Sequence, residues 1–413
     1  MEQRNNNTSL TENKKDVAVI IPVHNGANYL EETLRCVMNQ TLRSIEILVV
    51  DDGSTDDTAA IVSRLQEEDE RIRYIYQEKA NAGVARNRGM ESTDAAALIF
   101  LDGDDLFEPE MLEKMYGSLV EYAADMVVCD ADQYDTRTQE YLPKPQYMRS
   151  EYLPENESVF SKAELGEHIL YFTTSVPWNK LFRASFLKEN HLQFQDIERA
   201  NDQYLSILAL FLADKITAVR EVLVHYRINQ KGNLTTEFSR TPLCAYQAMV
   251  ATKEALTERG LIRDAKVKQA FDNKVINLMI YSLNIQRSAQ AYKELYDVLS
   301  GGGLEQLGLA GEGEEHYFNP LEYQNLQSFL SMPYDQFLVM KNREYRDVIA
   351  RKNVRYKEMV TKKDAVIADL KEKEKELKEI KRKNWYKKMV KWIDRYHSLR
   401  DKIRLPKDEG DKQ

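Results

Sequence analysis

The hydrophobic pattern of the first third of the chain alternates short apolar runs with longer amphipathic segments. The apolar runs are rich in Val, Ile and Leu and have the length of buried strands, whereas the segments between them repeat apolar residues at helical spacing. This alternation is typical of βαβ units and predicts an α/β fold with a mainly parallel, Rossmann-like sheet flanked by helices. The predicted strands are residues 17–21, 45–50, 71–76, 96–101 and 125–129, and the predicted helices are residues 29–41, 83–93, 109–122 and the segment after Thr55.

Later parts of the chain read mainly as helix. Residues 178–190 and 201–216 have apolar helical faces, residues 218–229 read as a late strand, and residues 242–299 keep helical periodicity. From Arg343 the sequence is charged and helix-favouring, with two apolar heptad positions, which indicates a long helix or a modest coiled coil. The predicted domains are a disordered tail (1–15), a main α/β domain (16–230), a helical appendage (231–340), a long charged helix or coiled coil with a basic amphipathic end (341–405) and a second tail (406–413). The heptad residues are Met359, Val366 and Ile380 at one position and Tyr356, Leu370 and Leu377 at the other.

Composition adds that the chain can form a sizeable core and that its charge is uneven. Of the 413 residues, 43% are hydrophobic and 30% are charged, with a net charge of −9, which is ordinary for a globular protein. The part after Lys341 is basic and the preceding part is acidic, so we expect them to meet different partners.

No apolar run approaches the roughly 18 residues of a membrane-spanning helix, and residues 1–16 lack a signal-peptide core. We therefore expect a cytoplasmic protein.

Acidic residues cluster where two of the predicted strands end. Asp51 and Asp52 close the second strand, and Asp102, Asp104 and Asp105 follow the fourth. Since parallel sheets bind ligands at the carboxyl ends of their strands, both clusters should face one site. An isolated DxD is more often a turn or a helix cap, but carboxylates beside a phosphate suit Mg²⁺ or Mn²⁺. The three cysteines are isolated and the six histidines show no ligand spacing, so we expect any metal to be a hard cation held by oxygen.

Four segments accompany these carboxylates in order along the chain. They read IIPVHNGANYLEETLRCVMNQT, ILVVDDGSTDDT, NAGVARNRGM and ALIFLDGDDLFEP. Together they resemble the family 2 glycosyltransferases, and the resemblance extends over residues 17–229. It implies a GT-A fold and an inverting, nucleotide-sugar-dependent transferase of the bacterial cell-envelope or capsular polysaccharide type.

The resemblance also implies a donor site. Asp51 or Asp52 would contact the uracil and ribose of the donor, because a carboxylate can accept from the imide NH or from hydroxyls. Asp104 would hold a divalent cation, Mn²⁺ or Mg²⁺, at the diphosphate. NAGVARNRGM is shorter than the family's motif, which favours Arg86 and Asn87 over Asn81 as residues that face the site. The predicted nucleotide-sugar-binding residues are Pro22, Val23, Asn25, Asp51, Asp52, Asn81, Arg86, Asp102 and Gly103.

A second set of implied residues concerns the acceptor. The family places an acidic pair, commonly Glu-Asp, at the start of a late helix, and here Asn201 and Asp202 stand at that place. Asp202 is the predicted general base, with Asp196 and Glu198 as alternatives. Asp202 could instead be a structural carboxylate that caps this helix or lies in its first turn.

Two later segments also resemble family motifs. Trp178 and Asn179 are predicted to contact the acceptor, although Trp178 could equally pack against the sheet. His225, Arg227 and the loop near Lys231 could approach the diphosphate.

The implied function is transfer of a sugar from a UDP-sugar to a hydroxyl of a glycan, lipid-linked or cell-envelope polymer acceptor, by single displacement. A non-catalytic glycan-binding or scaffold protein with a transferase-like fold is the alternative, supported by Asn201. The basic segment 383–404, with aromatic residues at helical spacing, could lie on the inner face of the cell membrane or dock on protein, and residues 343–383 could form a homo-oligomer. We expect no nucleic-acid partner, because no recognition module accompanies the charge.

Overall fold

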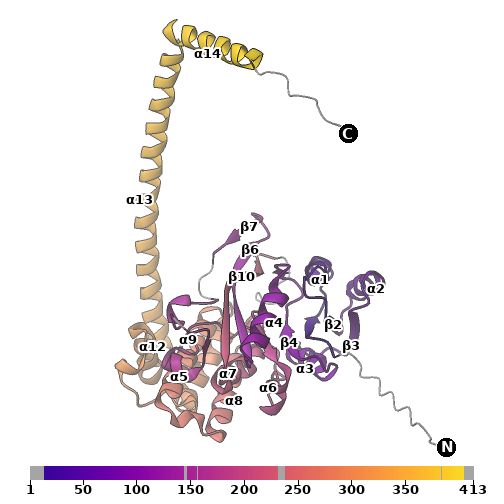
Figure 1. Ribbon diagram of the computed structural model, residues 1–413. Coiled ribbons are helices and arrows are strands. Elements are labelled where there is room, and N and C mark those ends of the chain that lie inside the picture. The colour runs from indigo at the N-terminus through magenta and orange to yellow at the C-terminus, as the bar shows by residue number, and fades with distance from the viewer. Residues whose placement is uncertain (1–13, 144–146, 156, 231–237, 383, 404–413) are drawn as a thin grey trace, which may run out of the picture. The chain divides into compact units, whose positions relative to one another are not determined.

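A computed structural model describes residues 14–143, 147–155, 157–230, 238–382 and 384–403 of the chain. The chain divides into two compact units, Met1–Tyr334 and Asp335–Gln413 (Figure 1). The first unit contains the sheet, and the described residues of the second are helical. We describe each unit by itself.

The first unit is built on one mixed sheet. Its order is β3-β2-β1-β4-β9-β6-β10-β5, with β7 paired to β6 and β8 to β10. Strands β1 to β4 are mutually parallel where they pair, as the sequence predicted. The strands are β1 Val17–Val23, β2 Ile45–Asp52, β3 Ile72–Gln77, β4 Ala97–Phe100, β5 Leu106–Phe107, β6 Met126–Asp135, β7 Glu140–Leu142, β8 Val159–Phe160, β9 Lys180–Arg183 and β10 Ile216–Ile228.

Helices cover both faces of this sheet, and β1 shows why its sequence is apolar throughout. Val17, Val19 and Ile21 join the core formed with α1, α2 and α4, while Ile20 meets Gly89 of α3 on the opposite face. All residues of β1 are buried, as expected for a strand covered on both sides. The helices are α1 Leu30–Met38, α2 Thr58–Glu68, α3 Ala82–Glu91, α4 Met111–Glu121, α5 Lys162–Leu165, α6 Ala184–Glu189 and α7 Asp202–Leu212.

The prediction of one continuous helix over residues 178–190 was wrong in its first half. Lys180–Arg183 forms β9, which is inserted antiparallel between β4 and β6, and the helix α6 begins only at Ala184. Leu181 and Phe182 are fully buried between the two neighbouring strands. Tertiary burial therefore overrides the helical spacing here, and the sheet is mixed rather than mainly parallel beyond β4.

A helical appendage completes the first unit, and two helices make up the described part of the second. In the appendage, Asp264 caps α9 by accepting from the amides of Lys266 and Val267. The heptad residues of the second unit whose side chains are described are exposed, and the coiled coil stays a prediction. The side chain of Ile380 lies outside the described residues. These helices are α8 Cys244–Glu258, α9 Ala265–Asn284, α10 Ala289–Val298, α11 Leu304–Leu307, α12 Pro320–Ser331, α13 Tyr334–Arg382 and α14 Asn384–Ile403.

Within the described residues, no helix combines the length and the apolar character required to span a bilayer.

The close packing of α3 on β1 yields a stability prediction. A Cβ added at Gly89 would lie 2.4 Å from Cγ2 of the buried, β-branched Ile20. We expect Gly89→Ala to lower the free energy of unfolding by about 1–3 kcal/mol, because the core cannot accept the methyl group without moving. Gly117→Ala in α4 is the matched control, since a Cβ there meets nothing within 4 Å. It should raise the free energy of unfolding by about 0.5–1 kcal/mol. Urea denaturation measures both, and equal or greater stability of Gly89→Ala would contradict the packing argument.

Candidate active site

The last residue of β2 and the segments that follow β1, β3 and β4 line a cleft of about 360 Å³ at the carboxyl edge of the sheet. The predicted residues that line this cleft are Pro22, Val23, Asn25, Asp52, Arg86, Asp102, Gly103 and Asp104. The topology therefore brings both acidic clusters to one cavity. Asp51, Asn81, Trp178, Asn179 and Asp202 are not among the lining residues.

Asp52 and its neighbour Asp51 have different surroundings although both end β2. Asp52 lines the cleft and accepts hydrogen bonds from Gln77 Nε2 at 2.8 Å, from the Ala80 amide at 2.8 Å and from Lys79 Nζ at 2.9 Å. Asp51 accepts from the Ser54 amide at 2.8 Å and from the Tyr74 hydroxyl at 2.6 Å. Asp51 thus fixes the turn after β2, and the geometry leaves Asp52 as the carboxylate beside the cleft.

Asn25 holds the loop after β1 against the loop after β2. Its backbone is left-handed, with φ 54°. Its amide donates to Ser54 Oγ, and its side-chain oxygen accepts from the Thr55 amide, both at 2.8 Å. Asp56 Oδ2 accepts from the Ala27 amide at 3.0 Å. These bonds fix the wall of the cleft formed by residues 24–28.

Three carboxylates crowd the turn after β4. Burial and then the charge of Asp102 raise the pKa of Asp104 to about 6. Burial, followed by the charges of Asp104 and Asp102, raises the pKa of Asp105 well above its ordinary value. Asp105 accepts from the Arg227 amide at 2.8 Å, and its other oxygen, Oδ2, is buried without a partner among the described residues. The turn therefore concentrates negative charge that the chain itself does not fully compensate.

Arg86 joins this turn to the start of α7. Its guanidinium donates to Asp102 Oδ1 at 2.8 Å and to Asn201 Oδ1 at 2.9 Å, and it lies 5.2 Å from the centre of the Phe194 ring. The side chain is almost fully buried. Arg86 thus fixes Asn201, and with it the first turn of α7, relative to the DxD segment.

Asp202 is the first residue of α7 and lies close to the same charges. Burial raises the pKa of Asp202, against the opposing charge of Arg86, and the charge of Asp102 adds to the increase. Gln203 Nε2 donates to Asp202 Oδ1 at 3.3 Å. The alternatives are placed differently, because Asp196 is bonded to Asn81 Nδ2 at 2.6 Å and Glu198 is exposed.

Three predicted contacts are not available in this geometry. Asn81 caps α3 by accepting from the amides of Gly83 and Val84, and its side-chain amide donates to Asp196, so both polar atoms of the side chain are engaged within the protein. Trp178 is 3% exposed and Asn179 is fully buried. The Trp178 ring packs against Tyr226, with 5.9 Å between ring centroids, and Asn179 Nδ2 donates to the Cys129 carbonyl at 2.9 Å. All three side chains thus have partners within the protein.

The late strand β10 also has structural roles where diphosphate contacts were suggested. Arg227 is buried and donates to the Asp104 carbonyl at 2.6 Å and to Glu32 at 2.8 Å. His225 is bonded to Asp132 and Glu108. Lys231 lies outside the described residues.

Some lining residues were not predicted. Lys79, two residues after β3, is ion-paired with Asp52 at 2.9 Å, and Gln230 lines the cleft and donates from Nε2 to the Arg227 carbonyl at 3.1 Å. Tyr29 lines the cleft beneath the Arg227 guanidinium, which lies 5.0 Å from its ring centre. Lys79 could have been found as the basic residue at the carboxyl end of the next strand, whereas Tyr29 and Gln230 carry no comparable signal.

The residues at the cleft fit a hard divalent cation. Asp102 and Asp104 offer carboxylates to one cavity, and a cation would relieve the repulsion that raises the pKa of Asp104. No group of three or more potential metal ligands exists among the described residues. Phosphate oxygens and waters would have to complete the coordination shell, which is the usual mode of Mg²⁺.

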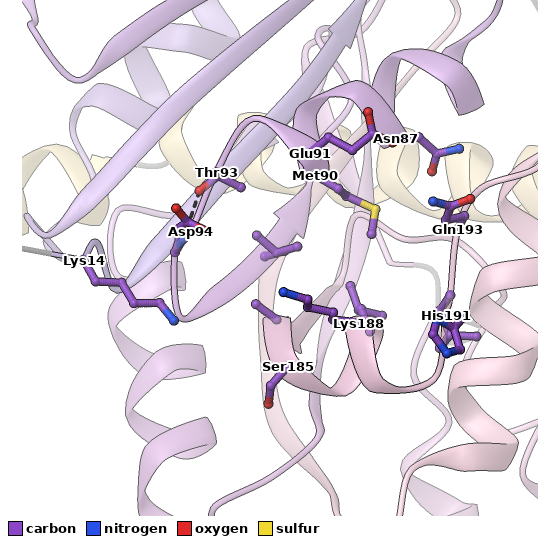
Figure 2. A pocket seen from close by; sticks show the side chains of 15 residues that line it. Lys14, Asn87, Met90, Glu91, Thr93, Asp94, Ser185, Lys188, His191 and Gln193 are labelled. Atoms are coloured by element: carbon purple, nitrogen blue, oxygen red, sulfur yellow. Dashed lines mark hydrogen bonds between the residues drawn. The ribbon is translucent and has the colours of Figure 1, made fainter. Parts of the chain in front are cut away.

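A second cavity, of about 720 Å³, lies at the amino end of β4 (Figure 2). It is lined by the end of α3, the segment before β4 and α6, with Lys14, Asp94 and Lys188 among the charged residues. Asn87, predicted to face the site, lines this cavity instead, and its side chain is bonded to the Phe194 main chain at 2.8 Å in both directions. We assign this cavity no part in the chemistry.

Comparison with known proteins gives a consistent picture. The family model "Glycosyl transferase family 2" matches residues 18–190. The glycosyltransferase GlyA of Streptococcus pneumoniae serotype 4 is 32% identical over 248 residues, which cover 59% of this chain and 34% of GlyA. TuaG of Bacillus subtilis (strain 168), named as a teichuronic acid biosynthesis glycosyltransferase, is 37% identical over 113 residues, covering 27% of this chain and 45% of TuaG.

The solved structures support the fold. The crystal structure of S. aureus TarS 1–349 in complex with UDP-GlcNAc has a TM-score of 0.57 at 18% identity, covering 71% of this chain and 81% of that one. This likeness agrees with a GT-A fold. The chain spans less than half the length of GlyA and of TuaG.

Proposed function

We propose that this chain, whose residues 18–190 match the family 2 glycosyltransferase model, transfers a sugar from a UDP-sugar to an acceptor hydroxyl with inversion at the anomeric carbon. The observation that carries the proposal is the convergence of Asp52, Asp102 and Asp104 on one cleft, with Asp202 linked to them through Arg86 and Asn201. A non-catalytic binding role would not require these carboxylates to share a cavity.

The surroundings of Asp52 support its assignment to the nucleotide. Its two oxygens offer about four lone-pair positions, and three bonds occupy them from within the chain. An imide NH of uracil or a ribose hydroxyl would take the remaining position. The donor is proposed as UDP-linked, in line with the UDP-GlcNAc present in the TarS structure. The transferred sugar is proposed to be a hexose or an N-acetylhexosamine.

A divalent cation, Mg²⁺ or Mn²⁺, is proposed at Asp104, with Asp102 beside it. Such an ion supplies positive charge to the departing diphosphate. The protein's own contribution is to hold the two carboxylates at one turn and to fix that turn through the Arg227 bond to the Asp104 carbonyl at 2.6 Å.

Asp202 is proposed to remove the proton from the acceptor hydroxyl as that oxygen attacks the anomeric carbon. The bond from this carbon to the diphosphate oxygen breaks as the new bond forms, so one displacement inverts the centre. A pKa raised by burial makes Asp202 a stronger base than an exposed aspartate.

Since TuaG is named for teichuronic acid biosynthesis, we propose a cell-envelope polymer or a lipid-linked glycan as acceptor, and a cytoplasmic site of action.

The basic amphipathic helix α14 is proposed to lie on an anionic membrane surface. Its described apolar residues are exposed and fall at helical spacing, and the Trp392 and Tyr396 rings stack with centroids 5.9 Å apart. Cationic helices with interfacial aromatic residues bind at the headgroup boundary of anionic bilayers. The apolar residues are Met389, Trp392, Ile393, Tyr396 and Leu399, and the cations are Lys387, Lys388, Lys391, Arg395 and Arg400. A homo-oligomer through residues 343–383 remains a separate proposal.

The general base can be tested by substitution. Asp202→Asn should retain UDP binding, because the residue does not line the donor cleft, and should lower the rate of transfer by about 10²–10⁴-fold. The measurement is turnover with a panel of UDP-sugars, together with calorimetric binding of UDP. Glu198→Gln, an exposed carboxylate upstream of α7, is the control and should keep its turnover. Unchanged transfer in Asp202→Asn would remove the assignment.

The cation is tested by binding rather than by turnover. UDP affinity of the wild-type protein should rise when Mg²⁺ or Mn²⁺ is added, and Asp104→Asn should lose this increase because the carboxylate beside the diphosphate is gone. Asp57→Asn, an exposed residue before α2, should keep it. Calorimetry with and without the metal measures both. A metal-independent UDP affinity in the wild-type protein would contradict the proposed cation, and no UDP binding at all would contradict the proposed function.

Membrane binding is tested with vesicles and the full chain. We expect co-sedimentation with phosphatidylglycerol vesicles and weaker partitioning into phosphatidylcholine vesicles. Trp392→Glu should reduce binding by about 10–100-fold, the equivalent of burying one large apolar side chain. Ser398→Glu adds the same charge on the polar side of α14 and should have a smaller effect. Equal effects of the two substitutions would show that the apolar residues do not enter the interface.

A further inference from the structure

Strands β6, β7 and β10 carry an aromatic surface at the same edge of the sheet as the donor cleft. β9 is antiparallel to both β4 and β6, so β4 and β6 run in the same direction, and β10 is parallel to β6. The ends of β6 and β10 therefore lie at the carboxyl edge, where β4 leads into Asp102. The hairpin of β6 and β7 projects from the sheet (Figure 1).

The register of these three strands brings five side chains to one face. Tyr141 of β7 pairs with Tyr134 of β6, which pairs in turn with Arg227 of β10. Two residues earlier on the parallel strands, Asp132 of β6 pairs with His225 of β10. Because residues two apart on a strand share a face and paired residues point to the same side, all five side chains lie on one side of the sheet.

Tyr141 is the most exposed ring of this face, and its neighbours hold it in place. The residue is 54% exposed. Its ring centre lies 5.1 Å from that of Tyr134 and 4.6 Å from that of His225. His225 is fixed in turn, because its ring nitrogens lie 2.6 Å from an oxygen of Asp132 and 3.0 Å from an oxygen of Glu108. Tyr141 therefore presents an aromatic ring to solvent from a fixed position.

A continuous series of side-chain contacts joins this ring to the donor cleft. The Arg227 guanidinium lies 5.4 Å from the centre of the Tyr134 ring and 5.0 Å from the centre of the Tyr29 ring, and Tyr29 lines the cleft. Arg227 also donates to the carbonyl of Asp104 at 2.6 Å. Only Tyr134 and Arg227 thus stand between the Tyr141 ring and residues of the cleft, so the two surfaces are close neighbours.

The chemistry around Tyr141 suits an uncharged saccharide. A pyranose has a C–H face that packs on an aromatic ring, and its hydroxyl groups donate to carboxylates. The Glu108 side chain at this surface is 47% exposed and can accept such bonds. Asp132 and Glu108 outnumber the histidine between them, so the cluster is negative in either protonation state of His225 and repels a bound anion.

We infer that Tyr141 forms a subsite for a neutral sugar unit of the acceptor, beyond the unit that receives the transferred sugar. This inference rests on the proposed function and names the chemical class of its acceptor, an uncharged stretch of oligosaccharide. The Tyr141 ring packs on the C–H face of that sugar, and Glu108 accepts from its hydroxyl groups. Because Tyr141 does not line the donor cleft, the subsite acts on acceptor affinity and leaves donor affinity unchanged.

The aromatic residues on the opposite side of the same strands are placed differently. Tyr226 of β10 packs on Trp178 and on Tyr147, with ring centres 5.9 and 6.4 Å apart. Trp178 and Tyr147 are buried, at 3% and 6% exposed. Tyr141 thus has the accessible ring that the sequence led us to expect of Trp178.

The test measures binding of oligosaccharides to the full chain saturated with UDP and Mg²⁺, so that the donor cleft is filled. The neutral probes are cellotriose, maltotriose and chitotriose, with methyl glucoside as the short reference and trigalacturonate as the anionic one. Isothermal titration and saturation-transfer NMR follow binding. We expect at least one neutral trisaccharide to bind about three- to tenfold more tightly than methyl glucoside, and more tightly than trigalacturonate.

The variants decide whether the Tyr141 ring is responsible. Tyr141→Leu keeps an apolar side chain against Tyr134 and His225 but removes the aromatic ring, and it should weaken trisaccharide binding about three- to tenfold. Tyr141→Phe should retain the binding. Tyr76→Leu is the matched control, because Tyr76 on β3 is 55% exposed, and it should bind as the wild-type protein does. UDP affinity and the urea midpoint should be equal in all variants, which separates loss of the ring from loss of folding.

Several outcomes would overturn the inference. These are tighter binding of trigalacturonate than of any neutral trisaccharide, no trisaccharide that binds better than methyl glucoside, full binding in Tyr141→Leu, and an equal loss in Tyr76→Leu. A dimer seen by sedimentation that dissociates in Tyr141→Leu would show that a second copy of the chain covers the ring instead. Failure of UDP to bind would count against the proposed function, and the titrations repeated without UDP would still decide the subsite.

Discussion

The bridge that Arg86 forms between Asp102 and Asn201 is the interaction on which the candidate active site depends. One buried guanidinium holds Asp102, after β4, and Asn201, before α7, at 2.8 and 2.9 Å. These two segments are far apart in the sequence, and each carries a carboxylate with a proposed role. Because the guanidinium is planar and its donors are fixed relative to one another, it sets the orientation of both partners as well as their separation. Asn201 is neutral, so it accepts from Arg86 without adding a further negative charge near Asp102.

The neutral side chain of Asn201 matters because negative charge is already crowded in the turn after β4. Asp102, Asp104 and Asp105 share one turn, and their proximity together with burial raises the pKa values of the second and third. A protein that only needed a stable turn would gain from replacing one of them by a neutral residue. Retention of all three is understandable if a cation shares the site, since the charge that destabilises the free protein then contributes to binding.

The parts of the fold that sequence alone could predict are those with short-range signals. Strands β1 to β4 are continuous apolar runs because both faces of the sheet are covered, and the carboxylates follow these strands directly. β9 was missed because four residues with a helix-like neighbourhood become a strand only through burial between β4 and β6. The sequence could not tell which of the two aspartates at the end of β2 lines the cleft. The Ser54 amide and the Tyr74 hydroxyl donate to the carboxylate of Asp51, which leaves Asp52 beside the cleft. Trp178 could be read as a ligand contact or as core, and its packing on Tyr226 places it in the core. Long-range contacts of this kind leave no periodicity to detect.

Lys274 illustrates the same limit. On α9 it is one of several lysines in an ordinary amphipathic helix, and nothing in its local sequence distinguishes it from Lys266 or Lys268. Lys268 is ion-paired with Asp272 at 2.6 Å, whereas Lys274 has instead the distant charges of Asp202 and Arg149. Burial lowers the pKa of Lys274 to about 8, so the side chain still carries its charge at neutral pH at a desolvation cost.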